Sequence, residues 1–310
     1  MSTKRVAAVV TVTLDEEISP SKGPFTADLV VECLEFFLEN STQELTDVIL
    51  VDNASPKPEM VDNLILSRVK PNRFIRLYEN RGINNVFREV LPLLDEYDIL
   101  AFAHSDFMII DKGWDELVVI AFDSDPKLAL AGVAGSSEVD RIGGRGLGTR
   151  TSFVGGLYRS GKGSGVDVHG KRIIGVNPAA VLDHCFMIFR RSVLEELAND
   201  SNTEEIFVPH HFGDKIFGCE ILERGYHVAL LGIPCDHLQG GRGIGLEQHN
   251  KACQQWLEER NIPFKPDETD HYMYLESERI FLSKWRDTLK FIPLRVNEDY
   301  SITHLHPDRT

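Results

Sequence analysis

The sequence predicts an α/β fold with a mostly parallel central sheet flanked by helices, followed by a helical C-terminal appendage. Two observations predict this class. The first hundred residues alternate between β-rich runs and segments with helical spacing, joined by short connections. The strand-like run from Val48 to Val51 is apolar at every position, which suits a parallel sheet covered by helices on both faces.

The expected elements follow one another along the chain. In the first third, strands are expected over 4–13, 47–51, 73–78 and 98–103, and helices over 27–38, 60–69 and 83–94. Later, strands are expected over 180–190 and 227–231, and helices over 192–198 and 212–224. Gly225 is expected to close the last of these helices in a left-handed conformation. Two amphipathic helical patterns, 247–260 and 275–289, end the sequence.

A glycine-rich stretch from Gly132 to Gly175 interrupts this alternation. Its glycines cluster around positions 143–146, 155–156 and 161–163, with weak strand patterns between them. Because ordinary connections are much shorter, we interpret the stretch as functional or mobile.

Composition excludes several classes of function. The 310 residues carry a formal net charge of −15, which disfavours nucleic acid or an anionic membrane as the main partner. The sequence has no membrane-spanning apolar run and no recognisable secretory leader. Its five cysteines are scattered and form no CxxC pair, as in proteins of a reducing compartment. A cytoplasmic protein without an integral membrane segment is therefore expected.

Polar residues stand where the expected parallel strands end, at the edge of the sheet where ligands collect. The second strand ends in Asp52 and Asn53, and Ser55 follows. Asp52 could accept hydrogen bonds from a base or a ribose. Alternatively, these residues form a turn and cap the next helix.

The fourth strand ends in His104-Ser105-Asp106. Residues two positions apart lie on the same side of a strand, so His104 and Asp106 can face one cation. Imidazole and carboxylate suit Mn²⁺ or Mg²⁺ when diphosphate oxygens and waters complete the shell. His237, after the last strand, is a candidate third ligand, and Arg242 in the following glycine-rich loop could approach a phosphate. The alternatives are a strand-end turn and a surface loop with a solvated histidine.

Asp214 begins the helix over 212–224. It could cap that helix, or it could act as a general base that takes a proton from an acceptor hydroxyl. The preceding His210-His211 pair suggests a second metal site, but without further ligands we favour packing or contact with an acceptor.

The order of these motifs resembles the family 2-type glycosyltransferases of the GT-A fold, a Rossmann-like fold, over about the first 240 residues. Four stretches carry the resemblance. They are VILVDNAS (48–55), Glu79-Asn80-Arg81-Gly82 with Asn84-Asn85, the strand ending at Asp106 (101–106), and LDHCFMIFRR (182–191) followed by Gly213-Asp214 and Gly225-Tyr226.

The resemblance implies transfer of a sugar from a UDP-, GDP- or dTDP-sugar to a glycan or other hydroxyl-bearing acceptor, with inversion and with Mn²⁺ or Mg²⁺. It implies a catalytic domain over 1–240. The C-terminal part has no clear match in the family, and its helical patterns predict a loop and helical extension over 241–310 that packs on this domain. Asp214 and Asp183 would be catalytic, and Asp106, His237 and His104 would bind the metal. The donor would be bound by Thr11, Asp52, Asn53, Asn80, Gly82, Ser105 and Arg242. The oligomeric state stays open.

The sequence departs from the family pattern at three points. The first strand lacks the usual Pro-x-Tyr-Asn, His104 replaces the first aspartate of the DxD motif, and Gly213 replaces the first acid of the "ED" motif. A retaining GT-A transferase and a catalytically silent nucleotide-sugar or glycan-binding protein are therefore kept as alternatives. A Rossmann dehydrogenase fits poorly, because no GxGxxG follows the first strand.

Overall fold

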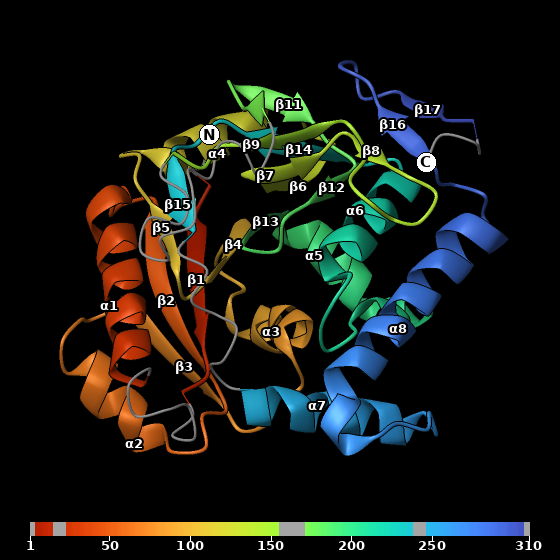
Figure 1. The fold of residues 1–310 in the computed structure, drawn as a ribbon. Coiled ribbons are helices and arrows are strands. Elements are labelled where there is room, and N and C mark those ends of the chain that lie inside the picture. The colour runs from red at the N-terminus through yellow and green to blue at the C-terminus, as the bar shows by residue number, and fades with distance from the viewer. Residues whose placement is uncertain (1–3, 15–22, 155–170, 238–245, 307–310) are drawn as a thin grey trace.

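A computed structural model describes residues 4–14, 23–154, 171–237 and 246–306. Its centre is an eight-stranded sheet in the order β11-β14-β6-β13-β4-β1-β2-β3 (Figure 1). The neighbours β1–β2, β1–β4, β2–β3 and β6–β14 are parallel, whereas β13 and β11 run antiparallel to their neighbours. The strands are β1 (Val6–Val12), β2 (Thr46–Asn53), β3 (Arg73–Leu77), β4 (Ile99–His104), β6 (Leu128–Gly132), β11 (Val176–Pro178), β13 (Phe186–Arg190) and β14 (His227–Leu231).

Helices cover both faces of this sheet and form two apolar cores with it. One core joins the sheet to α1 (Gly23–Asn40), α2 (Pro58–Val61) and α4 (Trp114–Ser124). The other joins it to α3 (Ile83–Val90), α5 (Arg191–Asn199) and α6 (Gly213–Glu223). In β1, Ala7 and Val9 face the second core, and Val6, Ala8 and Val10 face the first. This two-sided burial explains the continuous apolar strands, and the α/β prediction is confirmed.

The prediction of one strand over 180–190 is wrong. The segment divides into β12 (Val181–Leu182), which belongs to a four-stranded sheet β10-β9-β7-β12, and β13 in the central sheet. The chain turns between them, where the backbone N–H of Asp183 donates to the carbonyl of Ala134 and Asp183 Oδ1 accepts from the N–H of Cys185. The other strands of the small sheet are β7 (Ala134–Ser136), β9 (Thr149–Thr151) and β10 (Lys171–Arg172). This turn brings the Asp183 side chain into the site described below.

The C-terminal region consists of α7 (Leu246–Glu259), α8 (Thr269–Leu282), a further π-helical turn (Ser283–Thr288), β16 (Leu294–Val296) and β17 (Ile302–His304). Trp256, Leu257, Phe281 and Trp285 from these helices are buried in the same core as α3 and α6. The two strands, which the sequence did not predict, form a sheet with β8 (Glu138–Val139).

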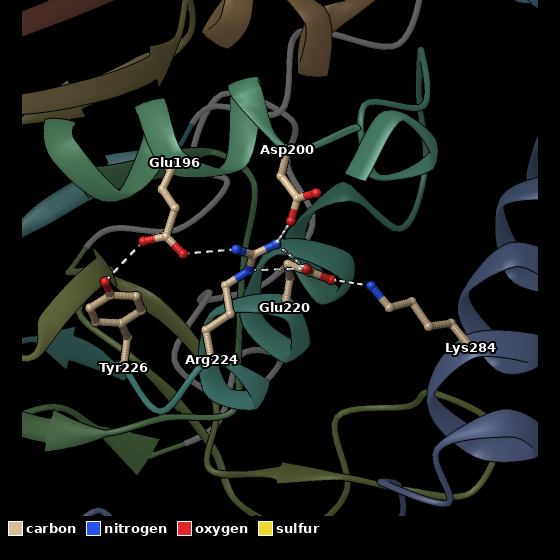
Figure 2. Close-up of polar contacts among 6 residues, drawn as sticks. All are labelled: Glu196, Asp200, Glu220, Arg224, Tyr226 and Lys284. Carbon is tan, nitrogen blue, oxygen red and sulfur yellow. Dashed lines mark hydrogen bonds and ion pairs between the residues drawn. The ribbon is translucent and has the colours of Figure 1, made fainter. Parts of the chain in front are cut away.

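A polar network also ties the π-helical turn to α6 (Figure 2). Arg224 donates to Glu220 (3.1 Å), to Glu196 (2.8 Å) and to Asp200 (2.6 Å), and Lys284 pairs with the other oxygen of Glu220. The side chain of Glu220 is only 4% exposed, so two cations balance its buried charge. Among the described residues, no helix is long and apolar enough to cross a membrane.

Candidate active site

The strand register brings the carboxyl ends of β1, β2 and β4 together. Thr11 lies beside His104, and Val12 lies beside Asp52. Asp52 is fully buried, and its two carboxylate oxygens accept from the N–H of Ser55 (2.9 Å) and from Arg76 Nε (2.9 Å). In this structure Asp52 therefore braces the loop that follows β2, as the turn interpretation expects.

Asn53 and Asn80 link the loops that follow β2 and β3. The carbonyl of Asn53 accepts from Asn80 Nδ2 (3.2 Å) and from the Thr13 hydroxyl (3.2 Å), and Asn80 Oδ1 accepts from the N–H of Gly82 (2.9 Å). The side-chain oxygen of Asn53 is buried and has no hydrogen-bond partner in the part of the chain that the structure describes. A buried acceptor of this kind is available to a ligand donor.

Two short strands bring the predicted metal ligands together. β5 (Phe107–Ile109) pairs with β15 (Cys235–His237), so that His237 stands opposite Phe107, next to Asp106. His237 Nε2 lies 3.2 Å from Asp106 Oδ1, and one ligand atom each from His104, Asp106 and His237 lie within 4.8 Å of one another. Two imidazoles and a buried carboxylate at these separations fit a divalent cation that also takes ligand oxygens. Burial alone would lower the pKa of His237, but the contact with Asp106 raises that pKa above its ordinary value.

A chain of hydrogen bonds orients His104. Asn84 Nδ2 donates to the carbonyl of Val208 (2.8 Å), so Asn84 Oδ1 accepts from His184 Nε2 (2.6 Å). Burial, with the charge of His104 second, lowers the pKa of His184 to about 3, so this imidazole is neutral and its Nδ1 accepts from His104 Nε2 (3.1 Å). His104 Nδ1 then keeps its lone pair for a cation, in the way that supporting hydrogen bonds orient metal-bound histidines.

Arg145 bridges the two predicted catalytic aspartates. Arg145 Nη2 lies 3.1 Å from Asp183 Oδ2 and 3.2 Å from Asp214 Oδ2, and Nη1 makes a further bond to Asp183. Burial would raise the pKa of Asp183, but the charge of Arg145 and the N–H of Cys185 hold it well below its ordinary value. Burial raises the pKa of Asp214, and Arg145 and Lys215 only partly offset this.

Sequence reasoning gave no role to Arg145. It stands in the Gly-Gly-Arg-Gly run (143–146) of the glycine-rich stretch (132–175), and an arginine flanked by glycines in a strongly acidic chain is the signal that points to it. His184, within the run LDHCFMIFRR (182–191), likewise carries no signal of its role in the sequence.

One cavity joins these groups. It has a volume of about 530 Å³, and its lining includes His104, Arg145, Asp183, His184, Asp214 and Lys215. His104 belongs both to the metal-ligand cluster and to the wall of this cavity. The cavity therefore extends from His104, one of the three candidate metal ligands, to Asp214.

The start of α3 supports the opposite wall. Gly82, with φ of 89°, approaches the backbone of Pro209 so closely that a Cβ at position 82 would lie 2.2 Å from the Pro209 carbonyl oxygen. Asn84 and Asn85 then donate to the carbonyls of Val208 and Phe207. In this structure Gly82 thus fixes the segment that leads into α6 and Asp214.

The remaining predicted residues are located as follows. Ser105 is half-buried in the turn between His104 and Asp106, and Arg242 lies outside the described residues. His210 and His211 line the cavity and meet His249 and Asp270 from the C-terminal helices, which the sequence did not indicate.

Comparisons with known proteins identify the fold. No protein-family model and no curated protein sequence matches the chain. The structure of GalNAc-T7 with UDP, GalNAc and Mn²⁺ aligns with 94% of this chain and 59% of its own, with 9% identity and a TM-score of 0.53. The mannosyltransferase PcManGT from Pyrobaculum calidifontis, in complex with GDP-Man and Mn²⁺, aligns over 92% of this chain and 76% of its own, with 14% identity and a TM-score of 0.49. S. aureus TarS in complex with UDP-GlcNAc aligns over 93% and 76%, with 13% identity and a TM-score of 0.45.

At these identities the likeness bears on the fold alone. The chain covers 59% of the GalNAc-T7 chain with which it aligns at a TM-score of 0.53. The mixed sheet, its strand order and this neighbour agree with the fold that the sequence motifs predict. The chain therefore has the GT-A-type fold of nucleotide-sugar glycosyltransferases.

Proposed function

We propose that this protein is a divalent-metal-dependent glycosyltransferase that transfers a sugar from a nucleotide-diphosphate donor to an acceptor hydroxyl with inversion. The observation that carries the proposal is one cavity that joins His104, of the candidate cation cluster, to the half-buried Asp214 carboxylate. An inverting nucleotide-sugar transferase needs a cation for the leaving group and a base for the nucleophile in one pocket, because leaving group and nucleophile stand on opposite sides of the reacting carbon.

His104, Asp106 and His237 would hold the cation, and the fold neighbour GalNAc-T7 was solved with UDP and Mn²⁺, which supports this assignment. When bound, the cation supplies Lewis-acid stabilisation of the diphosphate leaving group. His184 positions His104 through the bond between their ring nitrogens. The replacement of the first DxD aspartate by histidine is compatible with a cation that binds together with the donor.

Asp214 would accept the proton of the acceptor hydroxyl. The acceptor oxygen forms a bond to the anomeric carbon while the bond from that carbon to the diphosphate oxygen breaks, and the nucleoside diphosphate leaves with the electron pair. Arg145 orients the Asp214 carboxylate and pairs with Asp183 Oδ2, while Asp183 Oδ1 accepts from the N–H of Cys185. Asp183 lines the cavity and would hold a sugar or acceptor hydroxyl there. Thr11, Asn53, Asn80 and Gly82 would build the nucleoside end of the site.

Replacement of Asp214 by asparagine tests the proposal. If Asp214 is the base, transfer should fall by about 10²- to 10⁴-fold, with unchanged donor affinity. Donor affinity is measured by the thermal shift with UDP-, GDP- and dTDP-sugars in the presence of Mn²⁺. Asp267→Asn, the same change at an exposed aspartate outside the cavity, is the control and should retain most activity. A small loss of transfer in Asp214→Asn would instead indicate retention. Donor binding without transfer or hydrolysis by the wild-type protein would indicate a binding protein.

A further inference from the structure

We infer that the chain holds a second, zinc-type metal site, formed by His210, His249 and Asp270 with His211 beside them, which fastens the C-terminal helices to the loop that precedes Asp214. These four residues are called the three-histidine cluster below. The inference does not depend on the proposed glycosyltransfer, because the cluster shares no residue with His104, Asp106 and His237.

The cluster unites three distant segments of the chain. His210 and His211 immediately precede α6, His249 lies in the first turns of α7, and Asp270 lies in the first turn of α8. The ring centroid of His210 lies 4.1 Å from that of His211 and 4.2 Å from that of His249. All three imidazoles approach the same atom, Asp270 Oδ1.

The separations match a tetrahedral zinc shell. His210 Nδ1 lies 3.6 Å and His249 Nε2 lies 3.4 Å from Asp270 Oδ1. Bonds of about 2.0–2.1 Å from zinc to nitrogen and oxygen require neighbouring ligand atoms to be about 3.3–3.4 Å apart. The ligand atoms of His210, His249 and Asp270 all lie within 4.8 Å of one another, so small rotations of the side chains would complete the shell.

Hydrogen bonds from His211 (2.9 Å) and His249 (3.4 Å) to Asp270 hold part of this arrangement, but they leave one of its ring nitrogens unsatisfied. His210 Nδ1 is buried and has no hydrogen-bond partner among the described residues, which is a costly state for a ring nitrogen. Asp270 Oδ1 meets three ring nitrogens, of which only that of His211, at 2.9 Å, is at a short hydrogen-bonding distance. A cation between His210, His249 and Asp270 would satisfy the orphaned nitrogen and the crowded oxygen together.

The donor set indicates which metal. Two or three imidazoles with one carboxylate oxygen are typical of Zn²⁺ sites, whereas Mn²⁺ and Mg²⁺ prefer oxygen-rich shells. Cys253 lies one helical turn after His249, with its sulfur 3.6 Å from His249 Nε2, and adds a soft atom to the surroundings. His104, Asp106 and His237 offer the same protein donors, so a different metal preference at that site would come from the diphosphate oxygens that complete its shell when a donor is bound.

The position of the cluster suggests a supporting role. His211 and Phe212 adopt left-handed backbone conformations, with φ of 57° and 50°, immediately before the helix that carries Asp214. Such residues are strained and persist where surrounding contacts hold them. Zinc bound by His210, His249 and Asp270 would fix this strained segment, and with it the wall of the cavity, against α7 and α8.

Zinc binding by the 310-residue chain, without a polyhistidine tag, tests the inference. Isothermal titration with Zn²⁺ should give a saturable site in the wild-type protein, and Co²⁺ in its place should give the absorption of tetrahedral cobalt. His249→Ala and Asp270→Asn should each weaken zinc binding by more than about 100-fold, beyond the effect of losing a supporting hydrogen bond. Zn²⁺ should raise the Tm of the wild type but not of these variants.

Two controls make the result specific. His271→Ala removes an exposed histidine of α8 outside the cluster and should leave zinc affinity unchanged. His237→Ala, which alters the other candidate site, should also retain the zinc site. Circular dichroism establishes whether each variant is folded. If His249→Ala does not fold, the test uses Asp270→Asn, which is the milder change. Equal zinc affinity in the wild type, His249→Ala and Asp270→Asn would overturn the inference, as would the absence of saturable binding by the wild type.

Discussion

Replacement of Arg145 by methionine removes the guanidinium that bridges Asp183 and Asp214. The bonds to the two carboxylates measure 3.1 and 3.2 Å, and the side chains of the two aspartates are 26% and 15% exposed. Removal of one partner from a buried ion pair costs about 3–5 kcal/mol. Because these carboxylates keep partial access to water, we expect the free energy of unfolding at pH 7 to fall by about 2–3 kcal/mol.

The size of this loss should depend on pH. In the wild type the pKa of Asp183 is held below its unfolded value, so its contribution to stability is present above the unfolded pKa and is lost as the pH falls. Without Arg145, the pKa of both aspartates in the folded protein should rise. Protonation at mildly acidic pH should then relieve the variant, and the difference between Arg145→Met and the wild type should narrow.

Urea unfolding followed by tryptophan fluorescence at pH 7 and at about pH 5 measures both effects. Arg150→Met is the matched control, because Arg150 stands in the same glycine-rich stretch but bonds to the neutral side chain of Asn177. Addition of Asp214→Asn to Arg145→Met should restore part of the lost stability. A loss below about 0.5 kcal/mol, typical of ordinary surface substitutions, or an equal loss at both pH values would refute the reasoning.

Three further predictions follow from the structure. Burial raises the pKa of Asp214 above its ordinary value, and the kcat/KM of transfer should fall as the pH is lowered through that pKa. The residual activity of Asp214→Asn should not show this decrease at low pH. Gly82→Ala should lower the Tm more than Gly225→Ala. Both glycines have positive φ, so both substitutions strain the backbone. A Cβ at position 82 would also lie 2.2 Å from the Pro209 carbonyl oxygen, whereas a Cβ at position 225 would meet nothing within 4 Å. Arg224→Ala leaves the buried Glu220 with Lys284 as its remaining cation and should lower the free energy of unfolding by about 3 kcal/mol, and an unchanged urea midpoint would contradict this.

The first half of the central sheet could be predicted from the sequence because strands that are buried on both faces are apolar at nearly every position. The expected strand 47–51 is the middle of β2 (Thr46–Asn53), and the expected strand 98–103 is nearly the whole of β4 (Ile99–His104). The signal failed for α4. That helix buries Val118 and Phe122 but also exposes Leu117 and Ile120, which are 45% and 60% accessible, so its apolar residues do not trace one face.

The candidate site was predictable where it depends on strand ends and not where it depends on distant loops. Parallel register alone carries Thr11 and His104 to the same edge. By contrast, Arg145 arrives from a glycine-rich segment without a period, and its pairing with Asp183 depends on the turn that divides β12 from β13. Asp270 reaches His210 through the packing of α8, and no local pattern encodes such a long-range contact.

The central claim is that the cavity binds a nucleotide sugar together with a divalent cation and transfers the sugar. Its most direct test is the release of nucleoside diphosphate from UDP-, GDP- and dTDP-sugars, with and without Mn²⁺, by the wild type and by Asp106→Asn. We predict that the wild type releases nucleoside diphosphate from one of these donors only when the metal is present. Asp106→Asn should lose this release. No release and no thermal stabilisation with any pair of donor and metal, or equal release by the wild type and Asp106→Asn, would contradict it.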